Sequence, residues 1–405
     1  MIRYLMSVAT AALFTATCAP AQDLSAIARV DVTQSGVETG WLGGASFALS
    51  LSQGVPFRVF TLDAPRRLVI DFREVDWSGV RADDLHQEQG PLSSIRFGNF
   101  QPGWSRLVAT LTKPVVPDDI GMTIDDTTGR ALLQMGFKDV TEAEFAARSG
   151  APQNALWPDP PAYDLAAPVA DDRFVVVLDP GHGGVDPGAE REGHNEKKLM
   201  LQMALELREA LLRADDMDVI LTRDRDVFVS LEGRVALAHQ VGADLFLSLH
   251  ADALSQGGAQ GATIYTLSDA ASDTATAHLA ARHNRADVIA GTDLTGSDDE
   301  VASVLLDLAR QETEPRSQAL ARALVDGLTE AGGPMNNRPL RSAGFSVLKS
   351  ADIPSVLVEV GFLSSARDLK NLRDPTWRVR MVTGIVRSVL AWRDGDDAKR
   401  PLVRQ

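Results

Sequence analysis

Cysteine is almost absent from this sequence: among 405 residues there is one, Cys18, and it lies at the end of an N-terminal apolar segment. A chain with a single cysteine forms no internal disulfide and has no thiolate cluster for a metal ion. A metal site in this protein must therefore be built from imidazole and carboxylate groups, which seven histidines and 55 acidic residues can supply.

An excess of positive charge is also missing. The sequence has 40 Lys and Arg residues against 55 Asp and Glu residues, which gives a formal net charge of -15. Because nucleic acids and anionic membranes are bound by basic surfaces, this balance argues against either as the main partner. The hydrophobic fraction of 44% and the charged fraction of 23% are typical of a soluble globular protein, and the length predicts two domains with connectors.

No hydrophobic run is long enough to be a clear membrane span. Residues 5–14 form a short apolar stretch after Arg3, and Ala19-Pro20-Ala21 fits the small-x-small pattern of a signal-peptide cleavage site. We therefore expect residues 1–21 to be a cleaved signal peptide and the mature chain to have no transmembrane anchor. A short membrane anchor is the alternative, but the apolar run is well under the roughly 20 residues that cross a bilayer.

Residues 27–140 have the pattern of a β domain. Short segments of alternating or β-branched residues are separated by Gly, Pro and Asp, and long helical periodicity is missing. This pattern predicts a small N-terminal all-β sandwich. The region has no cluster of histidines and carboxylates, so we expect it to bind rather than to catalyse. Its clearest predicted strands are residues 46–51, 57–60, 68–72 and 106–111.

The second half of the chain has a different pattern of predicted secondary structure. Residues 141–173 are rich in Pro, Ala and Asp and predict a semi-extended linker. In residues 174–395, strands and helices alternate, which predicts an α/β domain with a mostly parallel sheet and helices on both faces. The predicted strands are 175–178, 219–222, 245–250, 263–267, 345–349 and 355–359, and the predicted helices are 196–213, 231–239 and 377–392.

Histidine and glutamate recur at the ends of these predicted elements. His182, His250 and Glu359 follow or end three buried strands, and Glu196 begins a helix. Because strand carboxyl ends and helix N-termini share one edge of an α/β sheet, the four side chains can converge. Two imidazoles, a carboxylate and a second carboxylate as base are what a catalytic zinc site needs. Taken alone, Glu196 also fits a solvated first-turn carboxylate.

Three aspartates accompany these residues. Asp179, Asp186 and Asp252 lie within a few positions of the two histidines and are candidates for orienting the imidazole rings. Glu359 ends an otherwise apolar strand, where a carboxylate needs either a partner or a function.

Five sequence motifs stand out in the chain. They are Asp179-Pro180-Gly181-His182-Gly183-Gly184, Glu196-Lys197, Ser248-Leu249-His250-Ala251-Asp252, Leu357-Val358-Glu359-Val360-Gly361-Phe362-Leu363 and Arg66-Arg67-Leu68-Val69-Ile70-Asp71-Phe72. The first four resemble the motifs of the zinc-dependent N-acetylmuramoyl-L-alanine amidases, periplasmic enzymes that cut peptidoglycan between N-acetylmuramic acid and the L-alanine of the stem peptide. This resemblance covers about residues 174–395, and residues 66–72 are similar to the AMIN domain that accompanies division-type members.

The resemblance implies a role for each candidate residue. His182, Glu196 and His250 would bind Zn²⁺, and Glu359 would be the catalytic carboxylate. The N-terminal domain would target peptidoglycan or the septum, and the enzyme would act in the periplasm in daughter-cell separation. Two alternatives stay open from the residues alone: a zinc peptidoglycan peptidase of the carboxypeptidase type, and a non-catalytic cell-wall-binding protein.

Residues 268–316 form an insertion that the α/β core does not require. Residues 275–289 and 301–310 are helical in pattern. Similar division amidases carry a regulatory helix here, which plugs the zinc site until a periplasmic activator withdraws it, and its glutamate in a Glu-Asn pair reaches the metal. Here His283 takes that place before Asn284. We therefore expect autoinhibition, with His283 as the inhibitory ligand; the alternative is an exposed helical excursion whose histidine has no such role.

Overall fold

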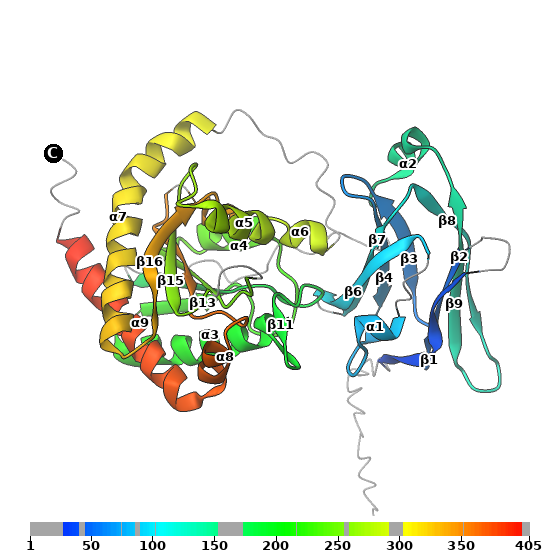
Figure 1. Cartoon of the computed structure of the whole chain (residues 1–405), viewed down its shortest axis with the longest axis horizontal. Coiled ribbons are helices and arrows are strands. Elements are labelled where there is room, and N and C mark those ends of the chain that lie inside the picture. Colours follow the sequence, from blue (N-terminus) through cyan, green and yellow to red (C-terminus); the bar gives the residue numbers. More distant parts are fainter. Residues whose placement is uncertain are drawn as a thin grey trace, which may run out of the picture.

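The computed structural model describes residues 27–398 except 40–44, 74, 86–89, 102, 153–172, 216, 255–258, 291–302 and 351. It contains a β domain, residues 27–152, and an α/β domain, residues 173–398 (Figure 1). The predicted signal peptide and most of the predicted linker lie outside the described residues. None of the described helices combines the length and apolarity needed to cross a bilayer.

The β domain is a sandwich of two sheets, as predicted. One sheet has the order β5-β1-β2-β9-β8 and the other β3-β4-β7-β6. Alternating apolar side chains, such as Leu68, Ile70 and Phe72, point between the sheets and form one core. The strands are β1 (Ala28–Thr39), β2 (Ala45–Leu51), β3 (Phe57–Leu62), β4 (Arg67–Arg73), β5 (Val75–Asp76), β6 (Leu92–Gln101), β7 (Trp104–Leu111), β8 (Val115–Ile124) and β9 (Ala131–Asp139), with a short helix α1 (Ala82–Leu85).

A second helix, α2 (Glu142–Arg148), occupies the start of the predicted linker. Thr141 and Glu144 form a capping box at its N-terminus, and Phe145 is buried in the core of the sandwich. The assignment of 141–148 to the linker was therefore wrong, because one aromatic side chain anchors this helix to the β domain.

The α/β domain is built on a six-stranded sheet of order β13-β10-β14-β17-β15-β16. The first four strands are parallel, β15 runs antiparallel to β17, and β16 is parallel to β15. This is the mostly parallel sheet predicted from the sequence. The strands are β10 (Phe174–Pro180), β13 (Met217–Leu221), β14 (Leu245–His250), β15 (Ala262–Leu267), β16 (Met335–Ala343) and β17 (Ser355–Glu359), beside a small hairpin of β11 (Glu190–Arg191) and β12 (His194–Asn195).

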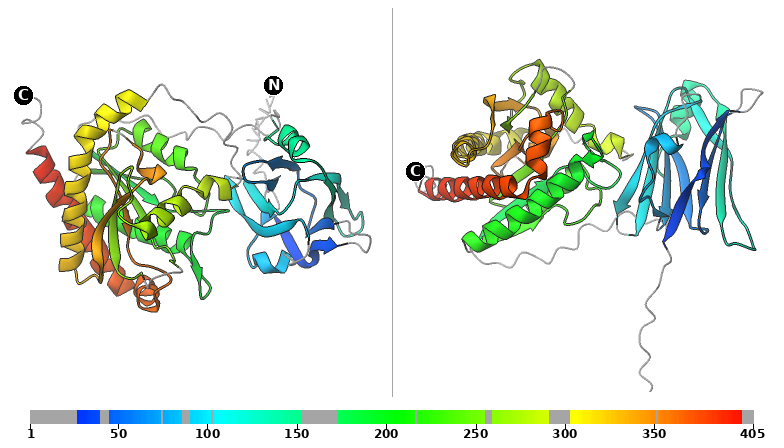
Figure 2. Two further views of the ribbon diagram at one scale, coloured as in Figure 1. Left: turned by 45° about the horizontal axis from the view of Figure 1, so that its top comes forward. Right: turned by 60° about the horizontal axis from the view of Figure 1, so that its bottom comes forward.

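Helices cover both faces of this sheet (Figure 2). Alternate residues of β10, such as Val176 and Val177, enter two different apolar clusters, as expected for a strand buried on both sides. One face packs against α3 (Glu196–Ala214), α7 (Ser303–Glu330), α8 (Ala366–Arg373) and α9 (Pro375–Asp397). The other packs against α4 (Leu231–Gln240) and α5 (Thr274–His283).

Three local predictions differ from the structure. Residues 345–349 are not a strand: they contain a 3-10 turn, η2 (Ser346–Leu348), which buries Val347 and Leu348 in the core that α4 also covers, and β16 forms the sheet edge instead. The helix predicted over 275–289 is interrupted after His283 and resumes as α6 (Ala286–Ile289). The helix predicted over 301–310 is much longer, because α7 continues through Pro315 along a buried row that includes Leu320, Leu324 and Leu328.

Candidate metal centre

The carboxyl edge of the parallel sheet brings the predicted site residues together. Strand register places His250 at the end of β14 directly beside Glu359 at the end of β17. In the neighbouring pair, Pro180 at the end of β10 lies beside Leu249 of β14. His182 follows two residues after β10, and Glu196 begins α3, whose N-terminus faces the same edge.

The turn after β10 is shaped to bring two imidazole rings close together. His182 has a left-handed backbone, with φ of 61°, which sharply redirects the chain after the strand. A Cβ atom on Gly181 would lie 2.2 Å from the ring of His250. Glycine at this position therefore lets the imidazole of His250 pack against the backbone of the loop that carries His182.

Glu196 lies between the two histidines. Its Oε2 is 3.1 Å from Nε2 of His182, and its Oε1 is 3.0 Å from Nδ1 of His250. One ligand atom from each of the three residues lies within 4.8 Å of the other two. The Nε2 atom of His182 is buried without a hydrogen-bond partner. A buried, unsatisfied imidazole nitrogen beside a carboxylate fits a metal ligand, and the N/O donor set suits zinc.

The electrostatics of this group favour a cation. Although burial opposes the shift, the carboxylates of Asp186 and Glu196 raise the pKa of His182 to about 10. Burial also opposes ionisation of Glu196, but His182 holds the pKa of this carboxyl well below its ordinary value. Burial and the neighbouring His283 lower the pKa of His250 to about 3. The two carboxylates that stabilise the proton on His182 would also stabilise a divalent cation bound there.

Glu359 is fully buried next to this group. Its Oε2 accepts a hydrogen bond from the backbone N–H of Asp252 at 2.9 Å, while its Oε1 has no hydrogen-bond partner. Burial raises the pKa of the Glu359 carboxyl above its ordinary value. The residue therefore presents one fixed oxygen and one free oxygen of increased basicity.

The three aspartates have different surroundings. Asp186 lies where the sequence predicted, with its Oδ2 2.7 Å from Nδ1 of His182. The expectation for Asp179 was wrong: it orients no imidazole but accepts hydrogen bonds from Ser248, Thr222 and the buried Arg234. Asp252 lies 3.5 Å from His283 rather than beside His182 or His250.

Sequence reasoning missed two buried arginines that hold the His182 loop. Arg223 donates to the carbonyl oxygens of Pro180 and Gly181 at 2.9 and 2.7 Å, and Arg234 donates to that of His182 at 2.9 Å. Both side chains are buried. One signal was available: Arg234 lies three and four residues before Leu237 and Ala238, on the apolar face of its helix.

His283, at the end of α5, closes the group from the opposite face of the sheet. It is buried, its ring centroid lies 4.2 Å from that of His250, and its Nε2 lies 3.6 Å from Oε1 of Glu359. His250, His283 and Glu359 form a second set whose ligand atoms lie within 4.8 Å of one another. Hydrogen bonds of Asn284 to the carbonyl oxygen of Gly344 and to the N–H of Ser346, each 2.8 Å long, fix the end of this helix.

Comparison with known proteins places the chain in a family. The model of the N-acetylmuramoyl-L-alanine amidase family matches residues 176–391, and that of the AMIN domain matches residues 42–131. An N-acetylmuramoyl-L-alanine amidase, AmiC, of Escherichia coli is 30% identical over 349 residues, which are 83% of this chain and 83% of that protein. AmiC of Neisseria meningitidis is 30% identical over 357 residues, 84% of this chain and 85% of that protein.

Another relative matches about half of the chain. AmiA of Escherichia coli is 38% identical over 222 residues, which are 54% of this chain and 76% of that protein. The family match extends over His182, Glu196, His250 and Glu359. The chain therefore belongs to the N-acetylmuramoyl-L-alanine amidase family, as an AMIN-containing member.

Proposed function

We propose that this protein hydrolyses the amide bond between N-acetylmuramic acid and L-alanine in peptidoglycan, and that it uses Zn²⁺ held by His182, Glu196 and His250. The observation that carries this proposal is the buried Nε2 of His182, which makes no hydrogen bond and lies 3.1 Å from Oε2 of Glu196, within a His-Glu-His set of donors. The family match supports the amidase over a carboxypeptidase or a non-catalytic binding protein.

The chemistry divides between the metal and the protein. When zinc is bound, it supplies Lewis-acid polarisation of a carbonyl oxygen and makes water more acidic. Glu359 acts as the general base and then as the general acid: its free Oε1 takes a proton from the attacking water and delivers it to the departing alanine nitrogen. The hydrogen bond from the N–H of Asp252 to Oε2 keeps the carboxylate in place during both transfers.

His283 makes the resting enzyme autoinhibited in this proposal. Its imidazole lies against His250 and Glu359, where the scissile amide has to enter. Arg282 and Asn284 fasten the same helix end, through an ion pair with Asp252 and a hydrogen bond to Gly344. A bias of a few kcal/mol is enough to keep most molecules closed. A periplasmic activator protein would withdraw the helix.

The biological setting follows from the same proposal. Residues 1–21 would direct export to the periplasm, and the β domain would bind peptidoglycan, so that the enzyme cuts the wall between daughter cells. A β-domain fragment, residues 27–152, should bind purified sacculi without degrading them. If only an α/β-domain fragment sediments with sacculi, targeting by the β domain is wrong.

Digestion of sacculi tests the reaction itself. Mass analysis should find stem peptides freed from N-acetylmuramic acid, and a chelator should stop their release. A carboxypeptidase would instead shorten the stem peptide and leave it attached.

Elemental analysis of His250→Ala tests the metal ligands. This variant should lose about one zinc per chain and, with it, the activity. If that variant keeps its full zinc content, the ligand assignment is wrong.

The inhibitory role of His283 needs a separate measurement. The activator-free rate of His283→Ala should rise well above that of the wild-type enzyme, while its zinc content stays the same. His278→Ala, on the same helix but outside both groups of potential metal ligands, is the matched control and should leave the rate unchanged. Equal rates for His283→Ala and the wild-type enzyme would remove His283 from the inhibitory mechanism.

A further inference from the structure

We propose that the β domain locks the inhibitory segment, defined here as residues 274–290, in the position that holds His283 over the metal centre. The lock is a contact between the outer face of the sheet β3-β4-β7-β6 and the end of α6. This inference rests on the proposed autoinhibition and adds to it the part of the chain that keeps the segment closed. Figure 1 shows α6 at the side of the α/β domain that faces the β domain.

Two buried arginines of the β domain hold the end of α6. Nη1 of Arg67 donates to the carbonyl oxygen of Val288 at 3.0 Å, and Nη1 of Arg106 donates to that of Ala290 at 3.2 Å. Cationic donors near the carbonyl groups at the end of a helix are favourable. The β domain therefore adds two cationic donors to the end of α6, where the N–H of Ala290 also lies against the carbonyl oxygen of Val288.

The motif that resembles AMIN domains builds this contact. Arg67 and Asp71 alternate with core residues on β4 and so share its outer face. Asp71 accepts two hydrogen bonds from Arg106, at 2.5 and 2.9 Å, and one from Arg58 at 2.8 Å. The guanidinium of Arg106 lies 3.5 Å from the ring centroid of Phe100. Arg106 is thus fixed in direction before it meets α6.

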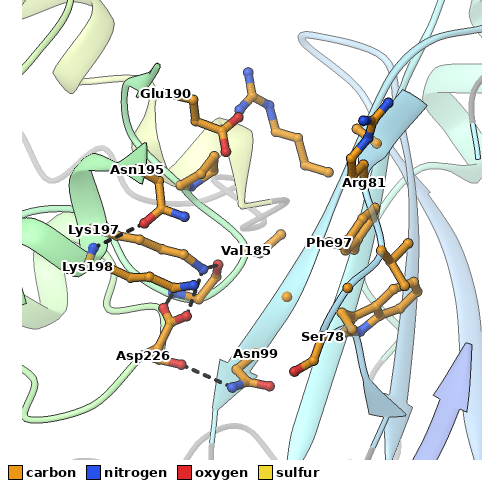
Figure 3. A pocket seen from close by; sticks show the side chains of 18 of the residues that line it. Ser78, Arg81, Phe97, Asn99, Val185, Glu190, Asn195, Lys197, Lys198 and Asp226 are labelled. Carbon is orange, nitrogen blue, oxygen red and sulfur yellow. Dashed lines mark hydrogen bonds and ion pairs between the residues drawn. The ribbon is translucent and has the colours of Figure 1, made fainter. Parts of the chain in front are cut away.

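The same strip of the β domain also contacts the loop that carries His182. Phe100 stacks on Phe228 with ring centroids 5.8 Å apart, and Val185 and Ala290 join this small apolar cluster. The N–H of Val185 donates to the carbonyl oxygen of Asn99 at 3.0 Å. Figure 3 shows the bond from Asn99 to Asp226, which is 3.2 Å long and ends on a backbone oxygen.

The contact lies beside an open cleft. This cleft, of about 870 Å³, separates the two domains and is lined by residues of both, including Arg81, Phe97, Glu190 and Lys198 (Figure 3). Contacts between domains of one chain allow relative motion unless they are large and hydrophobic. Only Asn284 and Arg285 separate α5 from α6, so a displacement of α6 acts directly on His283. Separation of the domains would therefore loosen the inhibitory segment.

Two variants break the contact from the β-domain side. Arg67→Met removes the donor to Val288, and its control, Arg66→Met, removes the adjacent arginine, which pairs with Glu142 inside the β domain. Gly98→Ala is a wedge, because a Cβ there would lie 2.6 Å from the carbonyl oxygen of Gly184. Its control is Gly121→Ala on β8, where a Cβ meets no atom within 4 Å.

Hydrogen exchange of the full chain measures the lock without relying on activity. In Arg67→Met and Gly98→Ala, amide exchange across residues 274–290 should rise about tenfold, as expected for losing one charge-assisted hydrogen bond. Exchange in β7 and β14 should not change, which shows that both domains remain folded. The activator-free rate of both variants should rise, and Gly98→Ala should add nothing to His283→Ala.

The outcomes separate this lock from the proposed function. If amide exchange across residues 274–290 stays at the control level in both variants, the β domain does not lock the segment. This conclusion holds whatever effect His283→Ala has on the activator-free rate of hydrolysis. Faster exchange together with an unchanged rate in His283→Ala supports the lock and rejects the inhibitory role of the segment.

Discussion

Oδ2 of Asp186 lies 2.7 Å from Nδ1 of His182, four residues earlier in the same loop. The other oxygen of Asp186 accepts the N–H of Gly188 at 3.1 Å, so the carboxylate is held at both ends. A carboxylate at Nδ1 holds the proton on that nitrogen, so Nε2 is the nitrogen that offers a lone pair once the imidazolium loses its second proton. In the proposed site, Asp186 would therefore direct Nε2 of His182 toward the metal.

Asp186→Asn should weaken zinc binding about 10- to 100-fold, the usual effect of losing such a partner of a ligand histidine. Competition with a chelator of known affinity measures this change. Asp218→Asn is the control, because Asp218 lies on β13 and pairs with Arg173, outside the group of potential metal ligands. Affinities that are equal in the two variants would mean that the loop backbone alone orients His182.

Zinc affinity should depend steeply on pH because His182 must lose its proton to bind a metal. With its pKa raised to about 10, His182 is protonated at pH 6 to 8 in the metal-free protein, whereas His250, with a pKa lowered to about 3, is already neutral. The apparent affinity should therefore rise about tenfold per pH unit over this range. Calorimetry in buffers of different ionisation enthalpy should find about one proton released per zinc.

The same shift has a consequence for the stability of the metal-free protein. Because the folded pKa of His182 lies above the unfolded value of about 6.5, its contribution is fully present below pH 6.5. It is lost as the pH rises through about 10. Zinc binding that releases no proton at pH 7 would contradict both statements, since His182 would then be neutral before binding.

Glu359→Gln should separate binding from chemistry. The amide keeps the shape of the side chain and can still accept the N–H of Asp252, but it cannot accept a proton from water. Zinc content should stay near that of the wild-type protein, while the rate on sacculi falls at least about 100-fold. A turnover close to the wild-type value would place the general base elsewhere.

Sequence reasoning could bring the four candidate residues together because they lie at element ends. Three buried strands and one amphipathic helix are enough to place His182, Glu196, His250 and Glu359 at one edge, since parallel strands share a direction. The strand register that puts His250 beside Glu359 could not be predicted, because it depends on packing across the whole sheet.

The contacts made by long polar side chains could not be predicted from the sequence. Asp179 precedes the His182 loop in the sequence, but its partner Arg234 lies 55 residues away, and nothing local indicates that pairing. In the same way, Arg67 and Val288 are 221 residues apart and belong to different domains. Residues 345–349 failed for another reason: an apolar pentapeptide fits a strand or a helical turn equally well until its neighbours are known.

The buried pair of Arg234 and Asp179 supplies the last prediction. Both side chains are almost completely buried, and Arg234 also donates to the carbonyl oxygens of Pro180 and His182. Arg234→Met should lower the free energy of unfolding of the α/β domain by about 3–5 kcal/mol, because it leaves a buried carboxylate without its cation. Arg208→Met, which breaks a partly exposed pair with Glu209, should cost about 1 kcal/mol or less.

Urea unfolding measures the free energy of unfolding of both variants. Zinc affinity should fall only in Arg234→Met, because the His182 loop loses its support. Equal destabilisation in the two variants would show that Asp179 is sufficiently stabilised by Thr222 and Ser248 alone.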